Sequence, residues 1–315
     1  MQIAVLDAMP ALSGDIDISA WKKLGIVSAY ARSAGALVRQ RLRGADIVLV
    51  HRTALTREDI LFARSLKMIG ILGSDYTAVD IAAAAQRGIP VCITPHFATR
   101  ETAQLTVSLV LELCGRVGRN NEKIRRGAWT ASRDYCWWEA APVSLYGKTA
   151  GIIGCGAVGR ETGRLLTAFG MRIIGYNPHR YEGFCGEYVS LPELYAGADV
   201  ILLHCPKTGE TAGMIDGQAL SAMKPGAFLV NTADGGLVIE QEIAAALSEN
   251  RLSGYAADTV STEPLSVHNP LLSAPNCVLS AHCGWASESA RQRMVDITAE
   301  NIRSFMAGTP VNTVF

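Results

Sequence analysis

Short apolar runs rich in valine and isoleucine alternate along the chain with longer segments of helical periodicity. Continuous runs of this kind are typical of strands that helices cover on both faces, so the pattern predicts an α/β fold with parallel sheets. The expected strands are Gln2–Leu6, Ile47–His51, Met68–Leu72, Pro90–Ile93, Thr149–Ile153, Met171–Tyr176, Val200–Leu203, Phe228–Asn231, Ser253–Ala257 and Cys277–Ser280.

The segments between the expected strands include two clear helix candidates. One is Asp80–Arg87, which Gly88 can end in a left-handed conformation that costs glycine little. The other spans Thr99–Arg119, where apolar residues recur in helical register. These residues are Leu105, Leu109, Leu113 and Val117. The later segment Gly127–Val143 has no such periodicity and is expected to be irregular.

Length and composition favour two folded domains. A chain of 315 residues exceeds what one hydrophobic core usually serves. Hydrophobic residues make up 49% of the chain and charged residues 18%, which is the balance of a fully folded protein and not of a disordered one.

Charge and the N-terminal segment bear on partners and location. The 29 basic and 29 acidic residues cancel, and no run of Lys or Arg exceeds a pair, which argues against nucleic acid or an anionic membrane as the main partner. The segment Met1–Asp7 lacks a basic region followed by a long apolar one, and no apolar stretch reaches the roughly 18 residues of a membrane span. We therefore expect a soluble, cytoplasmic protein.

The eight cysteines contain no CxxC pair, so the sequence predicts neither a zinc site nor a redox motif, and no metal is expected. Most of the cysteines are expected to be small buried apolar side chains. The alternative at one position is a reactive thiol at Cys283, which adjoins His282.

A glycine-rich turn follows the expected strand Thr149–Ile153. Its sequence is Gly-Cys-Gly-Ala-Val-Gly, and the residues after it continue as a helix over Arg160–Phe169. The pattern alone is weak, but strand, turn, helix and second strand in this order are typical of a Rossmann-type dinucleotide-binding unit. Such a turn lets a pyrophosphate approach backbone N–H groups at the helix N-terminus. The expected cofactor-binding residues in the turn are Gly154, Gly156, Ala157, Val158 and Gly159.

The second strand of this unit leads to Asn177, where an Asp or Glu usually binds the ribose hydroxyls of NAD. Losing the carboxylate removes repulsion toward a 2′-phosphate, and Arg180, with His179 beside it, is placed to pair with one. This favours NADP as the cofactor, or use of both NADP and NAD. The alternative is that Arg180 is a solvated surface residue.

Five blocks of the chain resemble, in order, the D-isomer-specific 2-hydroxyacid dehydrogenases. They are Arg52–Thr56, Leu203–Asp216, Met223–Val238, Gly254–Leu265 and Asn269–Trp285. The resemblance implies a flavodoxin-like substrate domain, residues 1–97 with a C-terminal helix in residues 288–315, into which a Rossmann-type dinucleotide-binding domain, residues 98–287, is inserted. It also implies oxidation or reduction of a small-molecule substrate in the cleft between the domains, and a homodimer.

The same resemblance assigns three residues to the chemistry. His282 matches the histidine that exchanges a proton with the substrate hydroxyl, Glu263 the glutamate that holds this histidine, and Asp258 the residue that orients the nicotinamide carboxamide. Imidazole suits proton exchange because it titrates near working pH. The resemblance further implies cofactor contacts at His204, Pro206, Thr211, Thr232, Ala233 and His282.

One family position differs in charge. The family motif NTARGG reads Asn-Thr-Ala-Asp-Gly-Gly here, so Asp234 stands where the family has the arginine that binds the substrate carboxylate. An ionised Asp only accepts hydrogen bonds and would repel a carboxylate, at a cost of roughly 4 kcal/mol near the protein surface. The loop with Ser74 and Asp75, matched to the family's carboxylate-binding loop, adds another acid, and Thr94–Ala98 departs from the family's TPGxN. A simple 2-oxo acid substrate is therefore unexpected.

Two alternatives would reconcile Asp234 with the family's chemistry. In the first, Arg52, Arg100 or Arg133 reaches the pocket and restores a cation. In the second, the substrate carries an amine or a hydroxyl that Asp234 or Asp75 binds.

Three functional interpretations stay open. The first is an NAD(P)-dependent oxidoreductase in which His282 and Glu263 relay a proton, acting on an atypical substrate such as a ketone or imine of a larger metabolite. The second is a cofactor-binding sensor with little catalysis, since Trp285 is similar to a pocket residue of corepressor-type relatives. The third is an isomerase or lyase that uses bound NAD catalytically.

Overall fold

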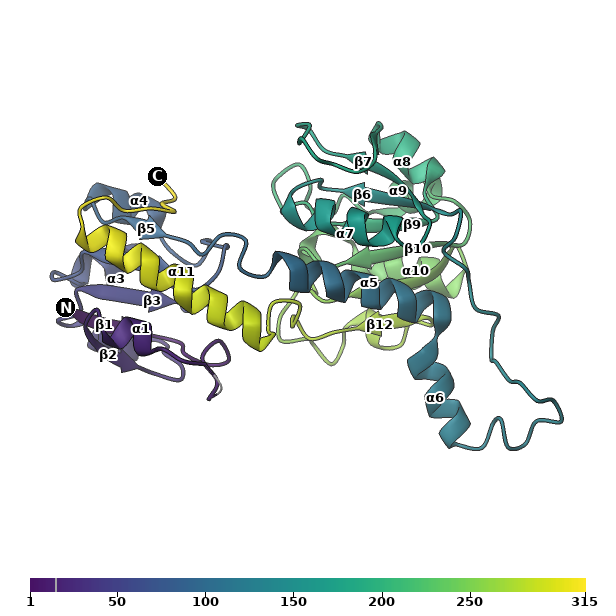
Figure 1. Ribbon diagram of the computed structural model, residues 1–315, viewed down its shortest axis with the longest axis horizontal. Helices are drawn as coiled ribbons and strands as arrows, with labels where there is room; N and C mark the ends of the chain where they lie inside the picture. The colour runs from purple at the N-terminus through teal and green to yellow at the C-terminus, as the bar shows by residue number, and fades with distance from the viewer. Residues whose placement is uncertain (15) are drawn as a thin grey trace. The chain divides into compact units, whose positions relative to one another are not determined.

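The computed structural model describes residues 1–14 and 16–315 and divides into two compact units. The first unit contains residues 1–98 and 285–315, and the second contains residues 99–284. Each unit is built on one parallel sheet with helices packed on it (Figure 1), which confirms the predicted α/β class. Among the described residues, no helix combines the length and the apolarity that crossing a membrane requires.

The first unit has a five-stranded sheet in the order β2-β1-β3-β4-β5, in which all neighbouring strands are parallel. The strands are β1 (Gln2–Val5), β2 (Ile26–Ala29), β3 (Ile47–Val50), β4 (Met68–Ile71) and β5 (Val91–Cys92). The helices are α1 (Ser19–Lys22), α2 (Ala36–Leu42), α3 (Arg57–Phe62), α4 (Ile81–Gln86) and α11 (Glu288–Met306). Strands β3 and β4 are buried at every position, as their continuous apolar runs require.

The C-terminal helix α11 is part of the first unit because one of its faces is apolar. Its buried apolar residues recur at the spacing of a helix face and pack with Trp21 and with residues of β1 and β3. They are Ala290, Met294, Val295, Ala299 and Ile302. The indole N–H of Trp21 also donates to the backbone oxygen of Val295 at 2.9 Å, so this contact between distant parts of the chain has a fixed geometry.

The second unit has a seven-stranded sheet in the order β12-β11-β10-β9-β6-β7-β8, again with all neighbours parallel. The strands are β6 (Thr149–Ile153), β7 (Arg172–Tyr176), β8 (Glu187–Tyr188), β9 (Val200–Leu203), β10 (Ala227–Asn231), β11 (Leu252–Ala257) and β12 (Cys277–Leu279). The helices are α5 (Thr99–Gly115), α6 (Val117–Arg125), α7 (Ala157–Thr167), α8 (Leu191–Gly197), α9 (Gly217–Ala222) and α10 (Glu240–Ser248), with short 3-10 turns η1 (Gly235–Leu237) and η2 (Pro270–Leu272).

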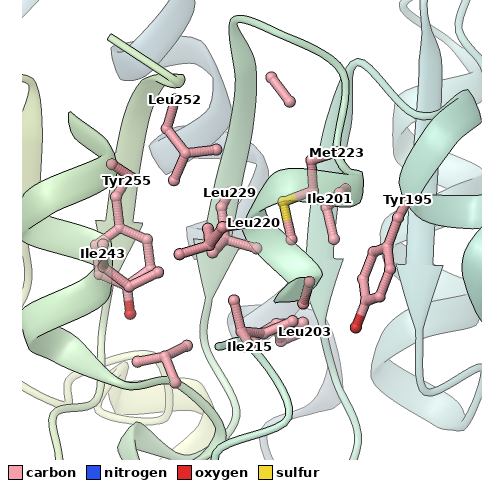
Figure 2. Packing of buried hydrophobic residues seen from close by; sticks show 14 of the residues in the cluster. Tyr195, Ile201, Leu203, Ile215, Leu220, Met223, Leu229, Ile243, Leu252 and Tyr255 are labelled. Carbon is pink, nitrogen blue, oxygen red and sulfur yellow. The ribbon is translucent and has the colours of Figure 1, made fainter. Parts of the chain in front are cut away.

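Alternate residues of the second sheet enter two separate cores. Ile201 and Leu203 of β9 lie in a cluster with residues of α8, α9 and α10 (Figure 2), whereas Val200 and Leu202 pack with residues of α5 and α7. The first cluster includes Tyr195, Ile201, Leu203, Ile215, Leu220, Met223, Leu229, Ile243, Leu252 and Tyr255. Each buried aliphatic side chain contributes about 1.5–3 kcal/mol to the stability of the fold. The two cores therefore fix the sheet that carries the loops.

The predicted single helix Thr99–Arg119 is wrong in its last part. Helix α5 ends before Arg116, which has a φ of 52°, and α6 begins directly after that residue. The Glu112 carboxylate accepts a hydrogen bond from the N–H of Gly118 at 3.0 Å, which satisfies a donor at the start of α6. Val117, which continues the apolar pattern in the sequence, is 71% exposed, so the pattern extended one turn beyond the buried face.

All the predicted strands are present, with ends that differ by one residue at most. The segment Gly127–Val143 contains no helix or strand, as expected. Strands β2 and β8 were not predicted. Both lie at sheet edges, and β2 has no buried residue, so neither carries the apolar run on which the prediction depended.

Candidate active site

Most of the predicted site residues lie where strands of the second sheet end. Because all its strands are parallel, their carboxyl ends meet along one edge, here called the carboxyl edge. Residues that follow strands β6, β7, β9, β10, β11 and β12 in this way are Gly154, Asn177, His204, Thr232, Asp258 and His282. The strand order reverses at β6, between β7 and β9, and open α/β sheets bind ligands at such a switch point.

The glycine turn after β6 has the form that a dinucleotide requires. A Cβ at Gly154 would lie 2.4 Å from the backbone N of Cys205, and one at Gly159 would lie 2.1 Å from the backbone O of Gly154. Gly156, in contrast, has open space where a Cβ would stand, and no side chain caps the helix α7 that begins there. The N–H groups of Ala157 and Val158 in the first turn of α7 are therefore accessible to a phosphate.

The loop after β7 is held by Asn177. Its Oδ1 accepts a hydrogen bond from the N–H of Cys155 at 3.1 Å, and its Nδ2 donates to the backbone oxygen of His179 at 2.8 Å. The Arg180 guanidinium lies 5.6 Å from the ring centre of Tyr188, a cation–π distance. The start of this loop, residues 177–181, thus presents cationic and neutral side chains, with Asn177 in the place of the usual carboxylate.

His204 is linked to two threonine hydroxyls. Its Nδ1 lies 3.5 Å from Oγ1 of Thr232, which in turn lies 2.8 Å from Oγ1 of Thr106 on α5. Burial lowers the pKa of His204 to about 4, so the ring is neutral near pH 7. Its Nε2 is buried without a hydrogen-bond partner among the described residues, which is the situation of a polar atom that a ligand could complete.

The other predicted cofactor residues lie on the loops after β9 and β10. The hydroxyl of Thr211 donates to the backbone oxygen of Pro206 at 2.7 Å, which closes the first loop. The N–H of Ala233 donates to Oδ1 of Asn231 at 3.1 Å, which fixes the start of the second. Both loops therefore have defined backbone geometry at the carboxyl edge.

His282 and Glu263 form a close pair. Nδ1 of His282 lies 2.7 Å from Oε2 of Glu263, and the Glu263 Oε1 accepts a hydrogen bond from the N–H of Val260 at 3.3 Å. An ionised carboxylate only accepts hydrogen bonds, so in this contact Nδ1 of His282 carries the hydrogen. The side chains are 30% and 37% exposed, so solvent and small molecules can reach the pair.

Asp258 has a contact that the sequence did not reveal. Its two carboxylate oxygens accept hydrogen bonds from the N–H groups of Cys283 at 3.0 Å and Gly284 at 2.9 Å. The N–H of His282 donates to the backbone oxygen of Asp258 at 2.8 Å. Buried Asp258 therefore fixes the turn that carries His282, where the His282 backbone has a φ of 52°.

Asp234 begins the short turn η1 at the carboxyl edge. Its Oδ1 accepts a hydrogen bond from the N–H of Gly236 at 2.7 Å, and its backbone oxygen accepts one from Nδ2 of Asn231 at 2.8 Å. The stem of Lys207 lies against Gly236, with its Nζ 2.8 Å from where a Cβ would stand. The carboxylate is partly exposed, and it retains accepting capacity beyond this one bond.

Three candidate substrate residues of the first unit, Arg52, Ser74 and Asp75, lie on loops after β3 and β4, and the fourth, Trp285, lies just before α11. Nη1 of Arg52 lies 3.3 Å from Oδ2 of Asp75, with both side chains about half exposed. The hydroxyl of Ser74 donates to the backbone oxygen of Thr94 at 3.2 Å. The Trp285 ring packs against His51 with a centroid distance of 4.7 Å. Arg52 is thus already paired with an acid, whereas Arg100 and Arg133 belong to the second unit.

Asp7 organises this loop and was missed by sequence reasoning. Its buried carboxylate accepts hydrogen bonds from the N–H groups of three consecutive residues, His51, Arg52 and Thr53, at 2.7, 2.6 and 2.5 Å. A polar residue two positions after the end of β1 was the available signal, because such positions lie at the carboxyl edge of a parallel sheet.

The expectation that most cysteines are buried is wrong. Only Cys92, Cys114 and Cys155 are buried, because most of the others lie in loops or irregular segments. Burial raises the pKa of the Cys92 and Cys114 thiols to about 11, which makes them unreactive near pH 7. Cys283 is exposed, with its sulfur 3.0 Å from Oγ of Ser280. No cluster of three metal-ligating side chains occurs among the described residues.

Comparison with known proteins identifies the family. Residues 107–284 match the model of the D-isomer specific 2-hydroxyacid dehydrogenase NAD-binding domain. The chain belongs to the D-isomer specific 2-hydroxyacid dehydrogenases. It is accordingly an NAD(P)-dependent oxidoreductase, which confirms the family predicted from the sequence blocks.

Several known proteins are similar to the chain along its whole length. The hydroxypyruvate reductase of Blautia hydrogenotrophica is 35% identical over 100% of this chain and 99% of its own length. The solved structure of the TT0316 protein from Thermus thermophilus is 32% identical, covers 100% of both chains and superposes with a TM-score of 0.88. An acyclic imino acid reductase, solved in complex with NADPH and D-Arg, is 27% identical over 100% of both chains, with a TM-score of 0.89.

Proposed function

We propose that this family member reduces a carbonyl or imine substrate, with His282 and Glu263 as its proton relay. The observation that carries the proposal is the 2.7 Å contact between Nδ1 of His282 and Oε2 of Glu263 at the carboxyl edge. A bound nicotinamide coenzyme supplies the hydride. Nε2 of His282 gives a proton to the substrate oxygen as a carbonyl is reduced, or to the nitrogen of an imine before its reduction, and Glu263 stabilises the imidazolium until that transfer leaves the ring neutral.

The residues of the carboxyl edge suit a dinucleotide. In the proposed mode, Gly156 and the N–H groups of Ala157 and Val158 hold the pyrophosphate, since no side chain occupies that space. His204, Pro206, Thr211, Thr232 and Ala233 line the loops toward the nicotinamide half. Asp258 retains lone pairs with which to accept from the carboxamide while it holds the turn of His282.

We propose that NADPH is accepted at least as well as NADH. Asn177 puts no negative charge where a 2′-phosphate would stand, and His179 and Arg180 follow it. Arg180 is positioned over Tyr188, from which a guanidinium can turn to a phosphate without losing a buried contact. The imino acid reductase of similar fold was solved with NADPH.

Asp234 is the basis of a proposal on substrate class. We propose that it occupies the position of the family's carboxylate-binding arginine, so a simple 2-oxo acid meets repulsion worth roughly 4 kcal/mol. A substrate with a protonated nitrogen or a hydroxyl would instead be attracted. An imine is favoured among these because it is protonated before reduction, and because of the similarity to an imino acid reductase.

Hydroxypyruvate reduction is the second candidate. The observation in its favour is 35% identity to a hydroxypyruvate reductase along the whole chain. It requires a cation at another position to bind the substrate carboxylate, because residue 234 is an acid. Lys207, whose ammonium lies beside Gly236, is one such group in the second unit.

A panel of substrates tests the function and the coenzyme together. Oxidation of NADPH and of NADH is followed with glyoxylate, hydroxypyruvate, a bulky 2-oxo acid, neutral ketones, and each 2-oxo acid mixed with ammonium or methylamine. We expect little turnover with 2-oxo acids alone and turnover with a ketone. Turnover is also expected once an imine can form, because Asp234 attracts its protonated nitrogen although the carboxylate remains. NADPH efficiency is expected to be at least equal to that of NADH.

Three results would contradict parts of this proposal. Efficient reduction of hydroxypyruvate without amine would refute the substrate class and leave the relay intact. A clearly higher efficiency with NADH would refute the coenzyme preference. Coenzyme binding without turnover across the whole panel would favour the sensor interpretation.

We also propose that the protein forms a homodimer through α6 and the segment 126–148. These elements extend away from the sheet of the second unit (Figure 1), and they carry exposed aromatic side chains. They are Trp129, Tyr135, Trp138 and Tyr146. Large exposed apolar surface of this kind is typical of interaction surfaces. Sedimentation equilibrium is expected to give about twice the chain mass of 33.6 kDa, and a single species at 33.6 kDa would refute the dimer.

A further inference from the structure

Glu240 is a buried carboxylate that the proposed function does not yet use. It is the first residue of α10 and is only 6% exposed. Three donors satisfy it: the N–H of Ser261 at 2.8 Å, the hydroxyl of Ser261 at 2.7 Å and Nδ2 of Asn269 at 2.8 Å. A buried charge costs several kcal/mol unless it is compensated, so Glu240 depends on these three donors and in turn fixes the residues that carry them.

The three donors belong to the loop that carries Glu263. Ser261 and Asn269 lie on either side of Glu263 in the segment between β11 and η2. The loop also rests directly on η1, because a Cβ at Gly235 would lie 2.0 Å from the backbone C of Val260. Gly235 and Glu240 therefore hold the same turn, one by close packing and the other by hydrogen bonds.

Hydrogen bonds link the turn at residues 260 and 261 to the proposed relay. The N–H of Val260, next to Ser261, donates to Oε1 of Glu263 at 3.3 Å, which leaves Oε2 for Nδ1 of His282 at 2.7 Å. The Glu263 side chain is 37% exposed, so little packing restrains its rotamers. The orientation of Glu263 thus depends on the backbone at residues 260 and 261.

We propose that Glu240 is a positioning residue, which fixes the turn at Val260 and Ser261 so that the Glu263 carboxylate faces His282. This inference rests on the proposed relay. Loosening the turn lets Glu263 sample conformations away from His282, so the imidazolium is stabilised for a smaller fraction of the time. The alternative is that Glu240 contributes only to the stability of α10 and its loop.

Titration of the His282 ring by NMR distinguishes these roles without any substrate. The six histidine signals are followed against pH in the coenzyme-free protein, and His282 is assigned by its absence from a His282→Gln variant. In Glu240→Gln, which places an amide among three donors, we expect the His282 midpoint to move to lower pH by about half a unit or more. Ser261→Ala, which removes only one donor, is expected to move it less, in the same direction.

Matched variants complete the test. Glu249→Gln makes the same change at the other end of α10, where exposed Glu249 pairs with partly exposed Arg251 at 2.8 Å, and it is expected to leave the midpoint unchanged. Asp258 and Cys283 also adjoin His282, and none of these variants alters them. Since Glu240 acts through Glu263, Glu240→Gln is expected to cause no further shift in a Glu263→Gln background.

The outcomes separate the inference from the function on which it rests. A shift in Glu263→Gln but none in Glu240→Gln or Ser261→Ala, even if both variants melt earlier, would overturn the positioning role and leave the relay standing. No shift in Glu263→Gln would remove the relay, and the inference with it. If Glu240→Gln does not fold, Ser261→Ala decides the question alone.

Discussion

Replacing Asp234 by arginine is expected to raise kcat/KM for a 2-oxo acid such as glyoxylate by about three powers of ten. The reason is electrostatic: a unit pair at about 4 Å near the surface is worth roughly 4 kcal/mol, and every 1.4 kcal/mol is a factor of ten. An arginine also offers a two-pronged hydrogen bond that a carboxylate accepts. Steady-state kinetics of wild type and variant, with both coenzymes, measure the change.

Two further variants control this experiment. Asp234→Asn keeps an oxygen that can accept from Gly236 N–H, but it removes the negative charge, so an intermediate gain is expected. Glu210→Arg makes the same change of charge at an exposed position of the second unit and is expected to have no such effect. Loss of the cap in Asp234→Arg costs about 1 kcal/mol, which a thermal melt detects.

The result would contradict the substrate proposal in one clear case. If wild type already reduces 2-oxo acids efficiently and Asp234→Arg does not improve them, another cation binds the carboxylate. Lys207→Met would then identify or eliminate the ammonium beside Gly236. Conversely, a gain for 2-oxo acids together with a loss for amine-containing substrates would support Asp234 as the residue that discriminates between them.

Removing the imidazole in His282→Gln is expected to lower kcat by a factor of roughly 10² to 10⁴, the usual contribution of a positioned general acid. Coenzyme affinity is expected to fall much less than kcat, because His282→Gln alters one expected coenzyme contact and leaves the glycine turn and the loop at Asn177 untouched. Glu263→Gln should lower kcat less, since the imidazole remains and loses only its orienting carboxylate. Kinetics and a coenzyme fluorescence titration together separate the two effects.

The two relay variants are also expected to be non-additive. Once His282 is replaced, Glu263→Gln should cost nothing more, because residues that act as a unit lose their effect together. His268→Gln makes the same change at an exposed histidine of the second unit and serves as the control. Unchanged kcat in His282→Gln would eliminate the relay and leave proton transfer to another group.

Sequence reasoning succeeded where the determining interactions are local. The strands β3, β6 and β9 follow from runs of apolar residues, and the turn at Gly154 follows from the spacing of its glycines. The sequence was less informative where the apolar pattern continues beyond the buried part of a helix. Val117 continues an apolar pattern but lies on a new helix, because a left-handed Arg116 ends α5.

The pairing of His282 with Glu263 was expected from the family resemblance, but the groups that hold the pair in place were not. Asp258 binds two N–H groups beside His282, and Glu240 binds the turn before Glu263. Neither role leaves a pattern in the sequence, since each is a hydrogen bond between residues more than 20 positions apart.

The sequence by itself determined the α/β class, the dinucleotide turn and the acid at position 234, because backbone propensity, glycine spacing and residue identity are properties of short segments. Only the tertiary structure decided how the acids are used. Asp7, Asp258 and Glu240 each satisfy backbone donors of a loop that lies far away in the chain. Buried carboxylates must find partners wherever the fold brings donors to them, so the partners are known only once the chain is folded.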